Sequence, residues 1–301
     1  MKLQRLAGAM AAGLMALTAC SQGDSASEGT AEAAGTNERI VVLDLGALDT
    51  VNALGEADRV VGIPKATPLP DSLSTFESDD IADVGGLKEP DIEAIASLDP
   101  DLVITGPRTA DLTQELSQHF ETLDVTYDQN KPFVEGASEA TLKIAEALDK
   151  TEEAEAKLEE FNTAVEDAKA GVPEGATALV VMSSGGKISA MNPSGRYALI
   201  YNDLGFTPAI ESVKEGSHGD PISFEGIQKA DPDYLFVLDR DAAIGETGGE
   251  AAEQILDNPL IHETKAWKND QVVYLDGPSW YIMMHGLDNM FAMLEDVTIP
   301  A

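Results

Sequence analysis

The sequence contains a single cysteine, Cys20, so no disulfide can form within the chain. Its 19 lysine and arginine residues stand against 54 aspartate and glutamate residues, which gives a formal net charge of −35. A surface this acidic repels nucleic acid, and we exclude nucleic-acid binding on that ground. Because cations are so few, they become informative only where several of them gather in one place.

Several motifs of catalysis and metal binding are also missing. The sequence has no HExxH or CxxC pair, no phosphate-binding P-loop and no GxGxxG fingerprint. Ser183, Ser184 and Ser194 lie near glycines, but none stands in a G-x-S-x-G elbow after a strand. An extracytoplasmic hydrolase that uses one of these serines with His218 and Asp239 is kept as an alternative. We predict that the chain is not an enzyme and that it carries no cofactor.

No apolar run in the sequence is long enough to span a bilayer as a helix. The apolar run Leu6 to Ala19 follows a basic start, and it is too short to cross. It ends in Leu-Thr-Ala directly before Cys20, which resembles a bacterial lipoprotein signal. We predict a signal peptide over residues 1–19 and a disordered tether over residues 20–38. Lipidated Cys20 would hold the mature chain at the outer side of the cell membrane.

From residue 39 onward, short apolar runs typical of buried strands alternate with helical segments. This alternation predicts an α/β fold with largely parallel sheets and helices on both faces. Residues 137–170 are rich in Ala, Glu, Lys and Leu without Gly or Pro, which predicts one long helix, or two in series with a break near Asp149. The expected parts are an N-terminal lobe over residues 39–133, a connecting helix over residues 134–171 and a C-terminal lobe over residues 172–301.

One stretch of sequence occurs twice. DIEAIASLDPDLVITGPR ends at Arg108, and SFEGIQKADPDYLFVLDR ends at Arg240 in the same register. Each copy has a carboxylate near a helix start, an Asp-Pro-Asp, an apolar run of strand type and a final arginine. The repeat indicates two related lobes. Parallel α/β sheets bind ligands beyond the carboxyl ends of their strands, so Arg108 and Arg240 are candidate ligand-binding residues.

A third arginine, Arg196, follows a glycine-containing loop at a helix start, which is another position that favours anions. If Arg108, Arg196 and Arg240 face one cleft, they would hold a ligand of about three negative charges, because guanidinium stays ionised and binds paired oxygens. The alternative is that each arginine pairs with a nearby acid, as Asp239 or Asp241 could do for Arg240.

Two further pairs of residues have both a structural and a functional interpretation. His218 and Tyr281 could ligate ferric iron, or they could be a hydrogen-bonding histidine and a packing aromatic beside Trp280. Glu93 and Glu225 each lie in the first turn of a predicted helix, where a carboxylate is favoured by the helix dipole. The functional interpretation is that each lobe presents one carboxylate to a two-fold partner.

Seven stretches together resemble the siderophore-binding lipoproteins of bacterial ABC importers, in particular the branch for catecholate complexes of the enterobactin and petrobactin type. They are VVGIPK, VGGLKEPDIEAI, SSGGKISAMNPSGR, SHGDPISFE, DPDYLFVLDRDAAIG, LDNPLI and VVYLDGPSWY. The resemblance covers nearly all of residues 39–296. It implies two Rossmann-like lobes joined by a single long α-helix, the class III periplasmic-binding-protein architecture, with a shallow cleft between the lobes.

The resemblance also implies roles for individual residues. It places at the ligand Arg108, Arg196, Arg240, His218, Tyr281 and Lys65, and at the membrane permease Glu93 and Glu225. His218 and Tyr281 would reach the metal only where the siderophore leaves iron positions open. The expected partners are a ferric siderophore, an ABC permease dimer with its ATPase, and the membrane through the lipid anchor. A receptor of this architecture for haem or a corrinoid is the alternative, and the number of arginines favours a trianionic ligand instead.

Overall fold

The computed structural model describes residues 37–210, 212–213, 219–246 and 249–299. The predicted signal peptide, Cys20 and His218 lie outside these residues, as does nearly all of the predicted tether. Within the described ranges, no helix combines the length and the apolar character that crossing a membrane requires.

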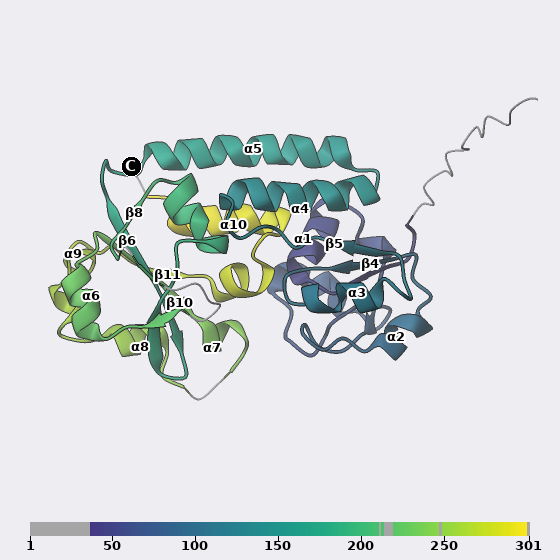
Figure 1. The fold of residues 1–301 in the computed structure, drawn as a ribbon, viewed down its shortest axis with the longest axis horizontal. Coiled ribbons are helices and arrows are strands. Elements are labelled where there is room, and N and C mark those ends of the chain that lie inside the picture. Colours follow the sequence, from purple (N-terminus) through teal and green to yellow (C-terminus); the bar gives the residue numbers. More distant parts are fainter. Residues whose placement is uncertain (1–36, 211, 214–218, 247–248, 300–301) are drawn as a thin grey trace, which may run out of the picture. The chain divides into compact units, whose positions relative to one another are not determined.

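A five-stranded parallel sheet forms the first lobe (Figure 1). Its strands are β1 (Ile40–Val42), β2 (Val60–Ile63), β3 (Ala82–Asp83), β4 (Leu102–Thr105) and β5 (Thr122–Asp124). Their spatial order is β3-β2-β1-β4-β5, and all four pairings are parallel. The chain reverses its winding direction between β1 and β4, so the carboxyl ends of these two strands flank the place where such sheets bind ligands.

The helices of the first lobe follow the strands closely. They are α1 (Leu45–Ala53), η1 (Ala57–Arg59), η2 (Asp71–Glu77), α2 (Ile92–Ser97), η3 (Ala110–Leu112) and α3 (Thr113–Leu116). Asp44 ends the turn after β1 and caps α1, because its carboxylate accepts the backbone N–H groups of Gly46 and Ala47. Both faces of β1 are buried, as expected for a parallel sheet covered on two sides.

The second lobe contains a mixed sheet. Its strands are β6 (Thr177–Ser184), β7 (Lys187–Ala190), β8 (Thr207–Pro208), β9 (Asp220–Pro221), β10 (Tyr234–Asp239) and β11 (Val272–Leu275). The order is β11-β10-β6-β7-β9, with β8 also paired to β6. β6, β8, β10 and β11 are parallel, whereas β7 and β9 are antiparallel to their neighbours. The reversal after β6 uses Gly185 and Gly186, which have φ values of 57° and 72°.

Two helices occupy the range expected to connect the lobes. α4 (Phe133–Ala147) and α5 (Thr151–Ala170) lie side by side (Figure 1), and Asp149 between them has a left-handed φ of 59°. The expected connecting helix of residues 134–171 is therefore divided, because the chain turns back after α4. In the described chain, α5 follows this turn and leads into the second sheet. It begins where Lys150 pairs with Glu56 at 3.1 Å, and it leads into β6.

The remaining helical segments of the second lobe are short except the last. They are η4 (Gly195–Tyr197), η5 (Leu199–Asp203), α6 (Phe224–Ala230), α7 (Arg240–Ala243), α8 (Ala252–Leu256), η6 (Ile261–Glu263), α9 (Lys265–Lys268), η7 (Pro278–Met283) and α10 (Leu287–Val297). α10 packs on α1 of the first lobe as well as on β11. Asp49 of α1 accepts the N–H groups of Asp288 and Asn289, so the first lobe caps the last helix. The limits of the C-terminal lobe stay a prediction.

The duplicated stretch adopts the same local structure in both lobes. The first copy is α2 followed by β4, and the second is α6 followed by β10. In each copy the first aspartate of Asp-Pro-Asp has a left-handed backbone, with φ of 47° at Asp99 and 42° at Asp231. The two copies thus put an arginine at or shortly after the carboxyl end of an inner strand in both sheets, as the sequence predicted.

Candidate functional site

Three arginines from different parts of the chain surround the ring of Tyr281. Arg108 follows β4, Arg196 lies in η4, and Arg240 is the first residue of α7. Their guanidinium carbons lie 5.7, 5.4 and 5.8 Å from the centre of the ring, in that order. Such distances permit cation–π attraction, which offsets part of the repulsion among three like charges. The predicted convergence is therefore present, while the role of these residues in binding a ligand stays a prediction.

The η7 segment carries Tyr281 and is held in place by both lobes. Arg108 donates to the backbone carbonyl of Tyr281, and its Nη1 lies 3.2 Å from the carbonyl oxygen of Ile282. Asn289 donates to the carbonyls of Ser279 and Met284 at 3.0 and 2.9 Å. Two of the N–H groups of Arg108 are thus engaged across the lobes, so this arginine also fixes the turn beneath the ring.

Arg240 has an acidic partner. Its Nη1 lies 3.2 Å from Oδ1 of Asp241 and 3.3 Å from Oγ of Ser184, and its Nε donates to the phenolic oxygen of Tyr281 at 3.1 Å. The alternative of local pairing thus holds for this arginine and for Asp241. Asp239 is differently engaged, since its carboxylate accepts the N–H groups of Ala242 and of a residue at the start of α8.

Arg196 has no acidic partner among the described residues. Its Nη2 donates to the phenolic oxygen of Tyr197 at 3.2 Å, and its Nη1 lies 3.3 Å from the sulfur of Met284. Its Nε is buried and makes no hydrogen bond in this part of the chain. A buried cationic donor without an acceptor is costly, so Arg196 is prepared to bind an anion.

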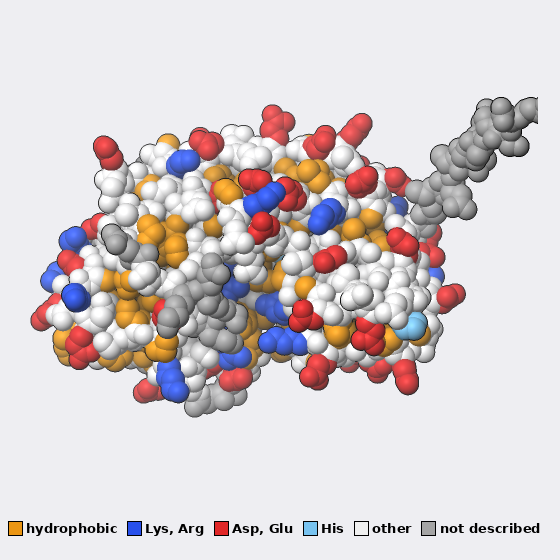
Figure 2. Space-filling view, in the orientation of Figure 1, with side chains coloured by type: hydrophobic (Ala, Val, Ile, Leu, Met, Phe, Trp, Pro, Cys, Tyr) orange, Lys and Arg blue, Asp and Glu red, His pale blue; other side chains and the backbone are white. Residues whose placement is uncertain are grey.

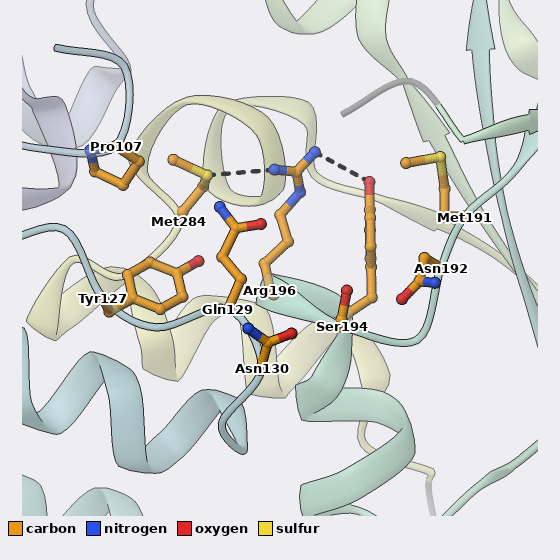
Figure 3. Close-up of a pocket in the computed structure, with 11 residues that line it drawn as sticks. Pro107, Tyr127, Gln129, Asn130, Met191, Asn192, Ser194, Arg196 and Met284 are labelled. Atoms are coloured by element: carbon orange, nitrogen blue, oxygen red, sulfur yellow. Dashed lines mark hydrogen bonds between the residues drawn. The ribbon is translucent and has the colours of Figure 1, made fainter. Parts of the chain in front are cut away.

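A cavity of about 300 Å³ opens beside Arg196 (Figure 3). Its lining consists of Pro107, Tyr127, Gln129, Asn130, Met191, Asn192, Ser194, Gly195, Arg196, Tyr197 and Met284. Both lobes contribute to it, and no Asp or Glu stands among these described lining residues. Figure 2 shows Lys and Arg side chains gathered at a hollow of the surface, whereas Asp and Glu side chains are spread over much of the rest of this face.

The electrostatics of the site follow from burial and from the neighbouring cations. Burial lowers the pKa of Arg108 from its ordinary value, and the charge of Arg196 lowers it further, whereas Asp44 acts in the opposite direction. Burial also raises the pKa of Tyr127 to about 12, so this phenol stays protonated near neutral pH. The cleft is therefore a cationic region lined by neutral hydrogen-bonding groups.

A buried pair below the arginines was not predicted from the sequence. Nε2 of His285 lies 3.6 Å from Oδ1 of Asp44, and neither nitrogen of this fully buried imidazole has a hydrogen-bond partner in the described chain. Burial lowers the pKa of His285. Asp44 follows β1 at the place where the winding direction of the sheet reverses. That position in the fold was the one signal that could have pointed to Asp44 as a site residue.

The other predicted residues lie elsewhere or outside the described ranges. Nζ of Lys65 donates to the carbonyl of Ser78 at 2.8 Å, which ties this side chain to its own loop. Glu93 and Glu225 are exposed in the first turns of α2 and α6, as predicted. The described residues contain no group of three or more His, Cys, Asp or Glu that could hold a metal ion. His218 is not described, so its pairing with Tyr281 stays a prediction.

The chain is similar in sequence and in fold to known binding proteins. It is 39% identical over 261 residues to the petrobactin-binding protein YclQ of Bacillus subtilis, covering 86% of this chain and 81% of YclQ. The crystal structure of YclQ has a TM-score of 0.81 at 38% identity, covering 87% of this chain and 90% of that one.

Two further solved structures are similar over most of their length. The iron uptake ABC transporter substrate-binding protein PiuA of Streptococcus pneumoniae is 32% identical with a TM-score of 0.80, covering 87% of this chain and 92% of its own. The periplasmic catecholate-siderophore binding protein VctP of Vibrio cholerae is also 32% identical, with a TM-score of 0.81 and coverages of 86% and 92%. The family model described as periplasmic binding protein matches residues 40–278. The chain therefore belongs to the periplasmic binding protein family.

Proposed function

We propose that this chain is the substrate-binding component of an ABC importer, which captures a ferric catecholate siderophore and delivers it to a membrane permease. The observation that carries the proposal is the gathering of three guanidinium groups around one ring in a chain with few cations. A ferric tris-catecholate carries three negative charges, and the three guanidinium groups would offset most of that charge, although Arg240 is also paired with Asp241. Charge-assisted hydrogen bonds of this kind contribute roughly 1.5–3 kcal/mol each.

Similarity to named proteins supports the same ligand class. YclQ is described as petrobactin-binding and VctP as catecholate-siderophore binding, and both align with most of this chain. A haem or corrinoid receptor has no comparable support from the relatives named above. The hydrolase alternative gains no support from Asp239, because its carboxylate has a structural role and accepts two backbone N–H groups.

We further propose that the protein acts outside the cytoplasm, held to the cell membrane by lipidated Cys20. Glu93 and Glu225 would then contact the two halves of a permease that works with an ATPase. Their exposure at helix starts, one in each copy of the repeat, supports this role. The charge reversals Glu93→Lys and Glu225→Lys should abolish uptake by cells without weakening ligand binding. Normal uptake in the double variant would contradict the assignment.

Tyr281 and His218 are proposed as iron ligands only for siderophores that leave two iron positions open. The phenolic oxygen of Tyr281 accepts a hydrogen bond from Arg240 and keeps a lone pair that could bind ferric iron. A bis-catecholate ferric complex should therefore shift its ligand-to-metal band on binding. The shift should vanish in the His218→Ala/Tyr281→Phe variant, whereas an unchanged spectrum in that variant would contradict direct ligation.

The central test is a titration with ferric tris-catecholate, haem and cobalamin, followed by tryptophan emission. Trp280 is fully buried and stacks on Tyr197, at 6.2 Å between ring centres, so an absorbing iron complex beside Arg196 should quench it. A Trp267→Phe background assigns the signal to Trp280. The gallium complex has the same charge without the iron absorption, and it should bind without comparable quenching. A response to haem or cobalamin alone, or turnover of an ester, would overturn the proposal.

A further inference from the structure

We infer that the cavity beside Arg196 is a separate subsite, which binds the uncharged hydrogen-bonding linker of the siderophore while the arginines bind its charged iron head. The inference rests on the proposed function and makes it more specific. It assigns ligand-selecting roles to Gln129 and Ser194, which the sequence analysis did not single out.

The first observation is the chemistry of the cavity wall. Gln129, Asn130, Asn192 and Ser194 contribute amide and hydroxyl groups, and Arg196 contributes the one charged group of the described lining (Figure 3). Neutral amides and hydroxyls bind amide, ester and hydroxyl groups without the desolvation cost of a charge. A wall without carboxylates offers nothing to neutralise an ammonium group, so a linker of amides or esters fits better than a polyamine.

The second observation is that several of these groups are free, although Nδ2 of Asn130 donates to Oδ1 of Asp128 at 3.0 Å. Within the described chain, the side-chain amide of Gln129 and the hydroxyl of Ser194 make no hydrogen bond. Asn192 uses its Nδ2 to donate to the carbonyl of Val213 at 2.8 Å and keeps its oxygen available. Donors and acceptors that face a cavity without protein partners are available for a ligand.

The third observation is a backbone hydrogen bond that joins the two sides of the cavity. The N–H of Gly195 in the second lobe donates to the carbonyl of Gln129 in the crossover from the first lobe, at 2.9 Å. Gly195 has a φ of 58°, and a side chain there would begin 3.4 Å from Oε1 of Gln129. The subsite is thus formed without ligand, which limits the ordering that binding would require.

The fourth observation is the position of the cavity relative to the arginines. Arg196 both lines the cavity and stands over Tyr281, whereas Arg108 and Arg240 do not line it. A volume of about 300 Å³ lies at the lower end of the range of roughly 300–1,000 Å³ for pockets that hold a whole small molecule, so it suits one polar arm better than a whole iron complex. One ligand would therefore lie with its head at Tyr281 and its linker against Gln129, with Arg196 between them.

The test compares two ferric complexes with the same coordination chemistry. One is a hexadentate tris-dihydroxybenzamide whose catechols are joined by an amide linker, and the other is iron with three unlinked N-methyl-dihydroxybenzamide molecules. The variant is Gln129→Leu/Ser194→Ala, and the matched control is Gln254→Leu on α8, away from the cavity. Losing two neutral hydrogen bonds should weaken the linked complex about tenfold and leave the unlinked complex within about twofold. The control should change neither.

Each other outcome has a definite meaning. An equal loss for both complexes would show a general effect on the cleft and overturn the subsite, and so would no loss for either. Urea unfolding of the variant checks that its fold is intact. If the unaltered protein binds neither complex, the proposed function itself fails and the subsite assignment with it. If it binds the linked complex with unchanged affinity in the variant, only the subsite is refuted.

Discussion

The three arginines should contribute unequally to binding of a trianionic ferric complex. Arg196 has no acid within ion-pair distance in the described chain, whereas Arg240 shares its charge with Asp241 at 3.2 Å. Replacing Arg196 by methionine removes one full positive charge and keeps much of the volume against Met284. Replacing Arg240 by alanine together with Asp241 by asparagine removes an ion pair and leaves the net charge of the cleft unchanged.

The contacts of Arg196 and Arg240 indicate how much binding free energy each of the two variants should lose. Arg196 can offer those N–H groups of its Nη atoms that do not bind Tyr197 or Met284, so its loss should cost about 3 kcal/mol, or on the order of 100-fold in affinity. The loss of this partly exposed ion pair between Arg240 and Asp241 should cost about 1 kcal/mol or less, roughly fivefold in affinity. Stability should respond in the opposite sense, because removing one of three clustered cations relieves repulsion. The free energy of unfolding of Arg196→Met should be unchanged or higher.

The assay is isothermal titration with a ferric tris-catecholate at two salt concentrations, since screening reduces a charge effect more than a packing effect. Urea unfolding of each variant gives the stability. The reasoning is refuted if Arg240→Ala/Asp241→Asn weakens binding as much as Arg196→Met does. It is also refuted if Arg196→Met loses affinity and stability together, because that pair of results indicates a structural role.

Three further predictions concern the residues that hold the lobes together. Arg108→Gln removes charge-assisted bonds to two carbonyls of η7 and should lower the free energy of unfolding by about 2 kcal/mol in urea, and no change would show that these bonds are not formed. Burial depresses the pKa of His285 below its ordinary 6.5, so the unfolded state binds more protons there and stability should fall as pH drops below 6.5. His285→Phe should flatten this part of the curve of melting temperature against pH, and an unaltered curve would contradict the assignment. Burial raises the pKa of Asp49 to about 6 from 3.8, so the folded state binds more protons and this carboxyl's contribution should fall as pH rises from about 4 to 6. Asp49→Asn should remove that slope, and a slope that persists in the variant would exclude Asp49 as its origin.

The repeat made much of this fold predictable from the sequence. An apolar run after Asp-Pro-Asp predicts a buried strand, and an arginine at the end of that run falls at the edge where parallel sheets bind ligands. Arg108 and Arg240 followed from that rule, and Arg196 from its place at a helix start. One long helix, or two in series with a break near Asp149, was expected after the first lobe, but the reversal of direction there was not, because a left-handed turn at Asp149 has no strong signal in a run of helix-forming residues.

The parts that could not be predicted depend on contacts between distant residues. Asp44 and His285 meet only because η7 returns across the first lobe, and nothing in the sequence around His285 shows that it is buried. Gln129 and Ser194 line the same cavity only because the two lobes meet there. The engagement of Arg240 by Asp241 was foreseen as an alternative, while the use of Arg108 to hold η7 was not.

The capping of α10 by Asp49 has a consequence for folding. The last helix takes its N-terminal hydrogen bonds from the first lobe and its packing from both lobes, so neither lobe completes its core without the other. A chain cut after α5 would leave the buried carboxylate of Asp49 without its two N–H donors and α1 without its cover. The two lobes should therefore unfold in a single cooperative transition, and separately expressed halves should regain structure only when they are mixed.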